Sequence, residues 1–124
     1  MHDKRPSTRE LFKRIQDAKE LLTDRQGFFA NPLKAVGELT ELDIGDTIEI
    51  WPLIRDLLHE ITPEDYMGTK PPQKSYEKTI MGHELLAFSW QSQKLGKKMY
   101  IKFALKNQCY YYVSLHESKQ EKFK

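Results

Sequence analysis

The chain has 124 residues, of which 39% are hydrophobic and 11% aromatic, and this composition suits one globular domain, residues 1–124, with a single core. No apolar run approaches the roughly 18 residues that span a bilayer, and the charged start, MHDKRPSTRE, lacks the apolar stretch of a signal peptide. The single cysteine, Cys109, excludes an internal disulfide, and the four histidines have no zinc-ligand spacing. We therefore expect a cytoplasmic protein with no membrane partner, no metal and no other cofactor.

The net charge of +2 conceals a division between the two halves of the chain. Residues 1–65 carry 9 Lys/Arg and 14 Asp/Glu, a net charge of −5, whereas residues 66–124 carry 11 and 4, a net charge of +7. A basic half favours a polyanionic partner, usually a nucleic acid, because phosphates attract Lys and Arg. The alternative is an ordinary solvated lysine surface.

Local signals predict two helices near the N-terminus. Ser7 and Glu10 form a capping box, and the apolar residues that follow recur at helical spacing, which predicts a helix over about 8–23. Asn31-Pro32 is typical of an N-cap followed by proline at the first helical position, so a second helix should cover 32–41.

A short extended segment at Phe28-Phe29 lies between these helices, and a third helix follows them. Because Pro52 is tolerated only in a first helical turn, the third helix should begin at about Asp46 or Trp51 and end at Glu60. Thr62-Pro63-Glu64-Asp65 repeats the pattern of a cap and a first-position proline, and it predicts one short helical turn.

Residues 68–80 mix Gly, Pro and Lys without a hydrophobic period, so we expect a mobile loop. Its lysines, among them Lys70 and Lys74, could contact phosphates. The loop could equally be a plain solvated connector, because loops are commonly polar.

From about Glu84 the hydrophobic period changes to two, which predicts an antiparallel sheet of three or more strands. With about three helices packed on it, the chain should have an α+β fold. The expected apolar sets are Leu86, Phe88 and Trp90, then Met99, Ile101, Phe103 and Leu105, and finally Cys109, Tyr111, Val113 and Leu115. The opposite face should carry Ser89 and Gln91, then Tyr100, Lys102, Ala104 and Lys106, and finally Tyr110, Tyr112, Ser114 and His116.

Pairing the last two apolar sets requires a three-residue loop, Lys106 to Gln108, because a two-residue loop would mix the faces. In this register His116 lies about one diagonal step from Tyr100. The expected opposite pairs are Leu105 with Cys109, Ile101 with Val113, Met99 with Leu115, Tyr100 with Ser114, and Lys102 with Tyr112.

The polar face carries the groups that metal-free RNA cleavage needs, namely a base, an acid and a cation for the charged phosphorane. His116 can transfer protons near neutral pH, Tyr100 can donate a proton or stack on a base, and Lys102 can neutralise the phosphate. Alone, each could be an ordinary strand residue. The candidate catalytic residues are His116, Tyr100, Lys102 and Gln91, and the candidate RNA-binding residues are Lys70, Lys74, Lys98 and Tyr112.

Four stretches, KRPSTRELFKRI, ITPEDY, KKMYIKFAL and YYVSLHES, together cover 35 of the 124 residues. With them the chain resembles the MqsR-type toxins of bacterial type II toxin–antitoxin systems, which have a RelE-like fold. The resemblance implies a ribosome-independent endoribonuclease that acts on mRNA and is neutralised by a cognate antitoxin protein. It places the family's strand tyrosine on Tyr100 and the basic residue of its last strand on His116.

The chain departs from this family at two positions. A family lysine falls at or near Gly68, which leaves Lys70 as a candidate substitute. The family glutamine corresponds either to Gln91, which follows Trp90, or by spacing to Ser89. A rival hypothesis is therefore a non-catalytic RNA- or protein-binding module on a RelE-like fold.

Overall fold

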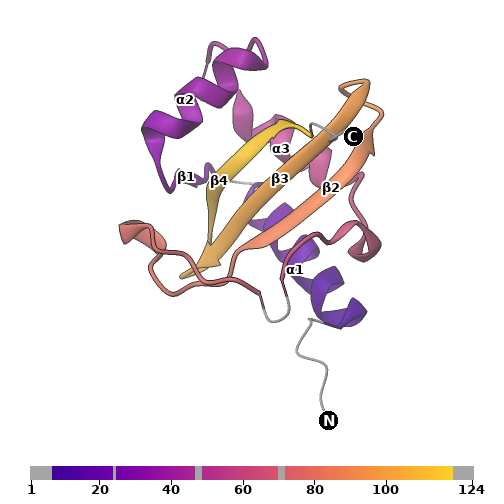
Figure 1. Ribbon diagram of the computed structural model, residues 1–124, viewed down its shortest axis with the longest axis vertical. Coiled ribbons are helices and arrows are strands. Elements are labelled where there is room, and N and C mark those ends of the chain that lie inside the picture. The colour runs from indigo at the N-terminus through magenta and orange to yellow at the C-terminus, as the bar shows by residue number, and fades with distance from the viewer. Residues whose placement is uncertain (1–6, 24, 47–48, 70–71, 119–124) are drawn as a thin grey trace, which may run out of the picture.

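A computed structural model shows three helices followed by most of a four-stranded mixed sheet, so the chain is α+β (Figure 1). The structure describes residues 7–23, 25–46, 49–69 and 72–118. Within them, no helix is long and apolar enough to cross a membrane. The elements in chain order are α1 (Thr8–Leu21), β1 (Phe28–Phe29), α2 (Pro32–Glu41), α3 (Ile50–Leu58), the 3-10 helices η1 (Pro63–Asp65) and η2 (Lys78–Ile80), β2 (Leu86–Ser92), β3 (Lys97–Lys106) and β4 (Cys109–Glu117).

Helices α1 and α2 begin where their capping residues predict. The Ser7 hydroxyl accepts a hydrogen bond from the Glu10 amide at 3.1 Å, and the Glu10 carboxylate accepts one from the Ser7 amide at 3.4 Å, which confirms the capping box. Asn31 caps α2, which spans the predicted range. Helix α3 begins at Ile50, so Pro52 lies in its first turn, as its missing amide requires. Helices α1 and α3 both end two residues earlier than predicted.

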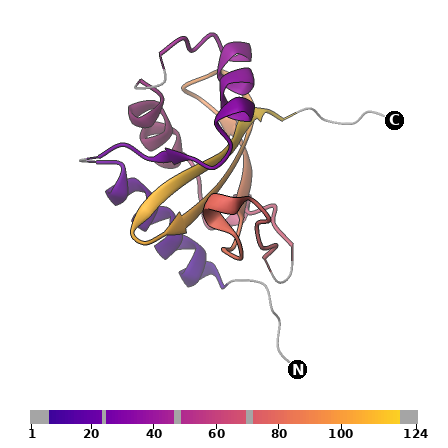
Figure 2. The same ribbon diagram turned by 90° about the vertical axis from the view of Figure 1, so that its left-hand side faces the viewer.

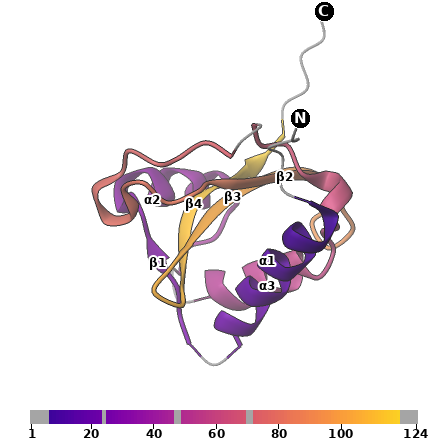
Figure 3. The same cartoon turned by 90° about the horizontal axis from the view of Figure 1, so that it is seen from below.

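The sheet has the strand order β1-β4-β3-β2, with β2, β3 and β4 antiparallel and β1 parallel to β4. Helices α1 and α3 cover one face of the sheet, as Figure 3 shows. Their apolar residues and those of the covered face form one hydrophobic cluster. The strand residues buried in it are Leu86, Phe88, Trp90, Met99, Ile101, Phe103, Tyr110, Tyr112 and Leu115.

The segment 72–85 folds back over part of the opposite face (Figure 2). Ile80 of η2 is fully buried there against Ala104 and Val113. Backbone hydrogen bonds hold the segment together, from Ser75 to His83 at 2.9 Å and from the Leu85 amide to the Gln73 carbonyl at 2.8 Å. The predicted mobile loop is therefore wrong for residues 72–80, because the buried apolar side chain anchors them to the sheet. Only the part of this face that the segment 72–85 leaves uncovered is open to solvent.

The predicted three-residue loop between β3 and β4 is also wrong. The turn has two residues, Asn107 and Gln108, with φ angles of 52° and 59°, and it pairs Lys106 with Cys109. Two positive φ values are typical of a type I′ turn, whose twist matches that of the flanking strands. With a two-residue turn, the β4 residues next to the turn face the side of the sheet opposite to the predicted one. A bulge in β4 opposite the Lys102/Phe103 step shifts the pairing by one residue, so the β4 residues beyond it face the predicted side.

The bulge explains which side of the sheet each β4 residue faces. Between the turn and the bulge, Tyr110 and Tyr112 lie opposite Leu105 and Phe103, and both are 1% exposed in the core. Their predicted place on the polar face is therefore wrong. The remaining observed pairs also differ from the predicted ones: Lys102 with Ser114, Ile101 with Leu115, Tyr100 with His116, and Met99 with Glu117.

Candidate functional site

The open part of the polar face spans β2, β3 and β4. One row across the sheet consists of Ser89, Tyr100 and His116, which are directly paired from strand to strand. Lys102 lies two residues from Tyr100 on β3, and therefore on the same face. The structure thus places three of the predicted catalytic residues, His116, Tyr100 and Lys102, side by side.

The side chains of this group contact one another. The rings of Tyr100 and His116 stack with their centroids 5.0 Å apart and an interplanar angle of 25°. The Nζ atom of Lys102 lies 5.9 Å from the centroid of the Tyr100 ring, within the range of a cation–π interaction. The predicted diagonal relation of His116 to Tyr100 is wrong, because the bulge brings the two residues directly opposite each other.

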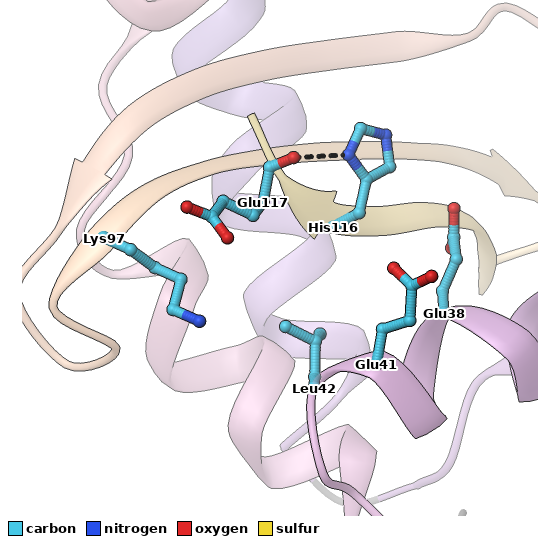
Figure 4. Close-up of a pocket in the computed structure, with 6 residues that line it drawn as sticks. All are labelled: Glu38, Glu41, Leu42, Lys97, His116 and Glu117. Carbon is cyan, nitrogen blue, oxygen red and sulfur yellow. Dashed lines mark hydrogen bonds between the residues drawn. The ribbon is translucent and has the colours of Figure 1, made fainter. Parts of the chain in front are cut away.

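The surroundings of His116 determine which ring nitrogen can act as a base. Its Nδ1 atom lies 2.9 Å from the main-chain carbonyl oxygen of Glu117 (Figure 4). Since a carbonyl oxygen only accepts hydrogen bonds, this contact favours the tautomer with the proton on Nδ1. The lone pair of the neutral imidazole is then on Nε2.

Tyr100 is suited to donate rather than accept a proton. Burial raises the pKa of its phenol, and the negative charge of Glu38 on α2 raises the pKa further. The phenol is therefore neutral at physiological pH and can donate a hydrogen bond to a developing oxyanion.

The two candidates for the position of the family glutamine, Ser89 and Gln91, lie at different distances along the sheet from Tyr100 and His116. Ser89 is opposite Tyr100, and its hydroxyl is 3.4 Å from that of Ser118. Gln91 is exposed two residue pairs beyond, opposite the exposed Lys98. Ser89 is therefore the direct neighbour of Tyr100, while Gln91 and Lys98 extend the same face.

Of the other predicted RNA-binding residues, the two that the structure describes, Lys74 and Tyr112, do not join this group. Lys74 is exposed on the segment that covers the sheet, where its backbone forms an isolated antiparallel β-bridge with that of Glu84. Lys70 lies outside the described residues. Tyr112 is buried in the core, and its hydroxyl donates a hydrogen bond to Glu38 at 2.7 Å. Its side chain is therefore not accessible to RNA.

Position 68, where the family lysine would fall, is closely covered by Tyr66. A Cβ atom added to Gly68 would lie 2.1 Å from the Tyr66 hydroxyl oxygen and 2.3 Å from its Cζ atom. The Tyr66 ring packs against Phe88, and its hydroxyl donates a hydrogen bond to the Thr69 carbonyl oxygen at 3.1 Å. A lysine at position 68 would therefore require this ring to move.

A pocket of about 290 Å³ lies where α2 approaches the end of β4. Glu38 and Glu41 come from α2, and Lys97 comes from β3 (Figure 4). Its other lining residues are Leu42, His116 and Glu117. Glu38 had no signal in the sequence, because its proximity to β4 depends on tertiary packing alone.

Within the described part of the chain, no group of three or more His, Cys, Asp or Glu side chains could hold a metal ion. Comparisons with protein-family models, with curated proteins and with solved structures identified no match. The geometry of the stacked pair and the charges around it therefore carry the functional argument.

Proposed function

We propose that this chain is a cytoplasmic endoribonuclease of the MqsR toxin type, which cuts mRNA without a metal and without the ribosome and is neutralised by a cognate antitoxin. The observation that carries the proposal is the stack of His116 on Tyr100 beside Lys102. The three groups offer a base, an acid and a cation on one open face. Helices that precede a sheet of this kind are compatible with a RelE-like fold, which is part of the proposal.

In the proposed reaction, Nε2 of His116 takes the proton of a ribose 2′-hydroxyl, whose oxygen then attacks the adjacent phosphorus. The bond from phosphorus to O2′ forms as the bond to O5′ breaks. Tyr100 gives its proton to O5′, and Lys102 stabilises the charge on the phosphorane. The products are a 2′,3′-cyclic phosphate and a 5′-hydroxyl. Transfer of the acquired proton from His116 to Tyr100 restores both groups, and their stacked rings place them close together.

The charges beside the pair give the RNA a direction of approach. Lys98 and Lys102 lie on β3, whereas in the pocket on the α2 side the three carboxylates of Glu38, Glu41 and Glu117 outnumber the single lysine, Lys97. Phosphates are attracted to the lysines and repelled by the carboxylates. The RNA backbone should therefore pass over β2 and β3 and reach His116 from that side.

The proposal is tested by incubating purified protein with mRNA and mapping the 5′ ends that appear. We expect His116→Ala to lower the cleavage rate by about 100-fold or more, because it removes the general base. Tyr100→Phe keeps the ring and removes only the proton donor, so it should lower the rate without weakening RNA binding. His59→Ala is the control, since His59 is exposed and its Nδ1 atom lies 2.9 Å from the Arg55 carbonyl oxygen on its own helix turn, away from the stacked pair. Parent-like cleavage by both site variants would reject the proposed mechanism.

The second candidate is a non-catalytic RNA- or protein-binding module. The observation that favours it is the Tyr66 ring over Gly68, because the lysine of the family is missing there. Such a module would bind RNA with a steep salt dependence and produce no fragments even at high protein concentration. Loss of growth when the chain is expressed alone, and its rescue by the product of an adjacent small gene, would favour the toxin.

A further inference from the structure

The bulge in β4 decides which side of the sheet His116 faces. From the turn to the pair of Phe103 with Tyr112, the two strands keep one register. If that register continued, His116 would lie opposite Met99, whose side chain is fully buried in the core. The bulge shifts the pairing by one residue, so His116 lies opposite Tyr100. The stacked pair therefore exists only while the bulge is kept.

Glu38 of α2 binds the chain on both sides of this bulge. Its Oε1 atom accepts hydrogen bonds from the Tyr112 hydroxyl at 2.7 Å and from the Leu115 amide at 2.9 Å. Its Oε2 atom accepts one from the Ser114 hydroxyl at 2.6 Å. Hydrogen bonds to a carboxylate are among the strong ones, and Tyr112 and Ser114 are both nearly inaccessible to water. Loss of the carboxylate would remove the acceptor of all three of these hydrogen bonds.

The position of α2 explains why a side chain, and not a neighbouring strand, binds this part of the β4 edge. Strand β1 pairs with β4 only at Tyr111 and Tyr112, and the Ala30 amide makes the last hydrogen bond to this edge, at 2.9 Å. The chain then turns into α2, and among the described residues no strand continues along β4. The carboxylate of Glu38 takes the place of the missing strand at the Leu115 amide.

We infer that Glu38 is a positioning residue that holds the β4 bulge and thereby keeps His116 stacked on Tyr100, an inference whose catalytic part rests on the proposed function. It acts through the strand and need not touch the RNA. The charge of Glu38 also raises the pKa of Tyr100, in addition to burial. Tyr100 is faced by His116 from β4 and by Lys102 from its own strand.

The first test needs no RNA. In Glu38→Gln, NMR should show loss of the ring-to-ring contacts between His116 and Tyr100, and exchange of the Leu115 amide should be at least about tenfold faster. Glu41→Gln is the matched control, because Glu41 lies on the same helix and lines the same pocket. Should Glu38→Gln not fold, Ser114→Ala removes one of the three hydrogen bonds and should weaken the same contacts. Parent-like ring contacts and parent-like Leu115 exchange in the folded variants would overturn the inference.

The second test measures cleavage. Glu38→Gln should lower kcat by about tenfold to 100-fold without raising KM, because a displaced base slows the chemical step and the lost carboxylate no longer repels the phosphates. The alkaline limb of the pH–rate profile should move to lower pH, since one of the causes that raise the pKa of Tyr100 is removed. Parent protein that cuts no RNA would reject the proposed function, whereas unchanged ring contacts in the folded variants would reject the positioning role.

Discussion

Two core tyrosines of β4 differ in what their hydroxyl groups contact. The Tyr112 hydroxyl donates to Glu38, whereas that of Tyr110 is buried without a hydrogen-bond partner among the described residues. Burying an unpaired hydroxyl costs stability, so Tyr110→Phe should raise the free energy of unfolding by about 1 kcal/mol. Tyr112→Phe should lower it by about 1–2 kcal/mol, because it removes a hydrogen bond to a charged acceptor. Urea unfolding of the two variants measures both effects, and a destabilised Tyr110→Phe would contradict this account.

At the scale of single residues, the alternation of side chains predicted the correct face of the sheet for some residues and the wrong face for others. Tyr100, Lys102 and His116 were predicted on one face, and the structure places them there. Tyr112 was assigned to the same face by alternation, yet it points into the core. A period of two cannot reveal a bulge, because the extra residue reverses the alternation without leaving a signal in the residue types.

At the scale of elements, the turn between β3 and β4 is strained in a way that one substitution should relieve. Gln108 has a φ of 59°, a left-handed conformation that glycine adopts more easily than other residues and that type I′ turns favour at this position. Gln108→Gly should therefore raise the free energy of unfolding by about 0.5–1 kcal/mol. Gln93→Gly is the matched control in the β2–β3 turn, where φ is not positive and glycine should bring no gain. Equal effects of the two changes on thermal unfolding would show that the backbone strain is absent.

The helices and their starts could be predicted because their signals are local. Ser7 and Glu10 lie three residues apart, and Asn31 directly precedes Pro32, so each cap is contained within a few positions. The covering of the sheet by the segment around Ile80 could not be predicted, because its partners are far away along the chain. The same holds for Glu38, whose contacts with β4 span more than seventy residues, from 74 to 77.

At the scale of the whole molecule, Glu60 links the helical layer to the sheet. It follows α3, and its carboxylate accepts hydrogen bonds from the Trp90 indole at 2.8 Å and from the Lys94 amide at 2.9 Å. Burial raises the pKa of this carboxyl, but the hydrogen bonds, above all that from Trp90, outweigh it, so the pKa of Glu60 lies below its ordinary value. The folded state therefore favours the ionised form more than the unfolded chain does.

This difference gives the stability of the fold a defined dependence on pH. The contribution of Glu60 is fully present above the pKa of the unfolded carboxyl, and it is lost as the pH falls through the lower pKa of the folded state. At neutral pH, Glu60→Gln should lower the free energy of unfolding by about 1 kcal/mol, a modest value because the carboxylate is partly exposed. Urea unfolding over a series of acid pH values should show the gap between parent and variant closing in that window. Glu64→Gln, at an exposed site on η1, should change little at any of these pH values. A gap that stayed constant through the acid range would mean that the ionised form of Glu60 does not join α3 to the sheet.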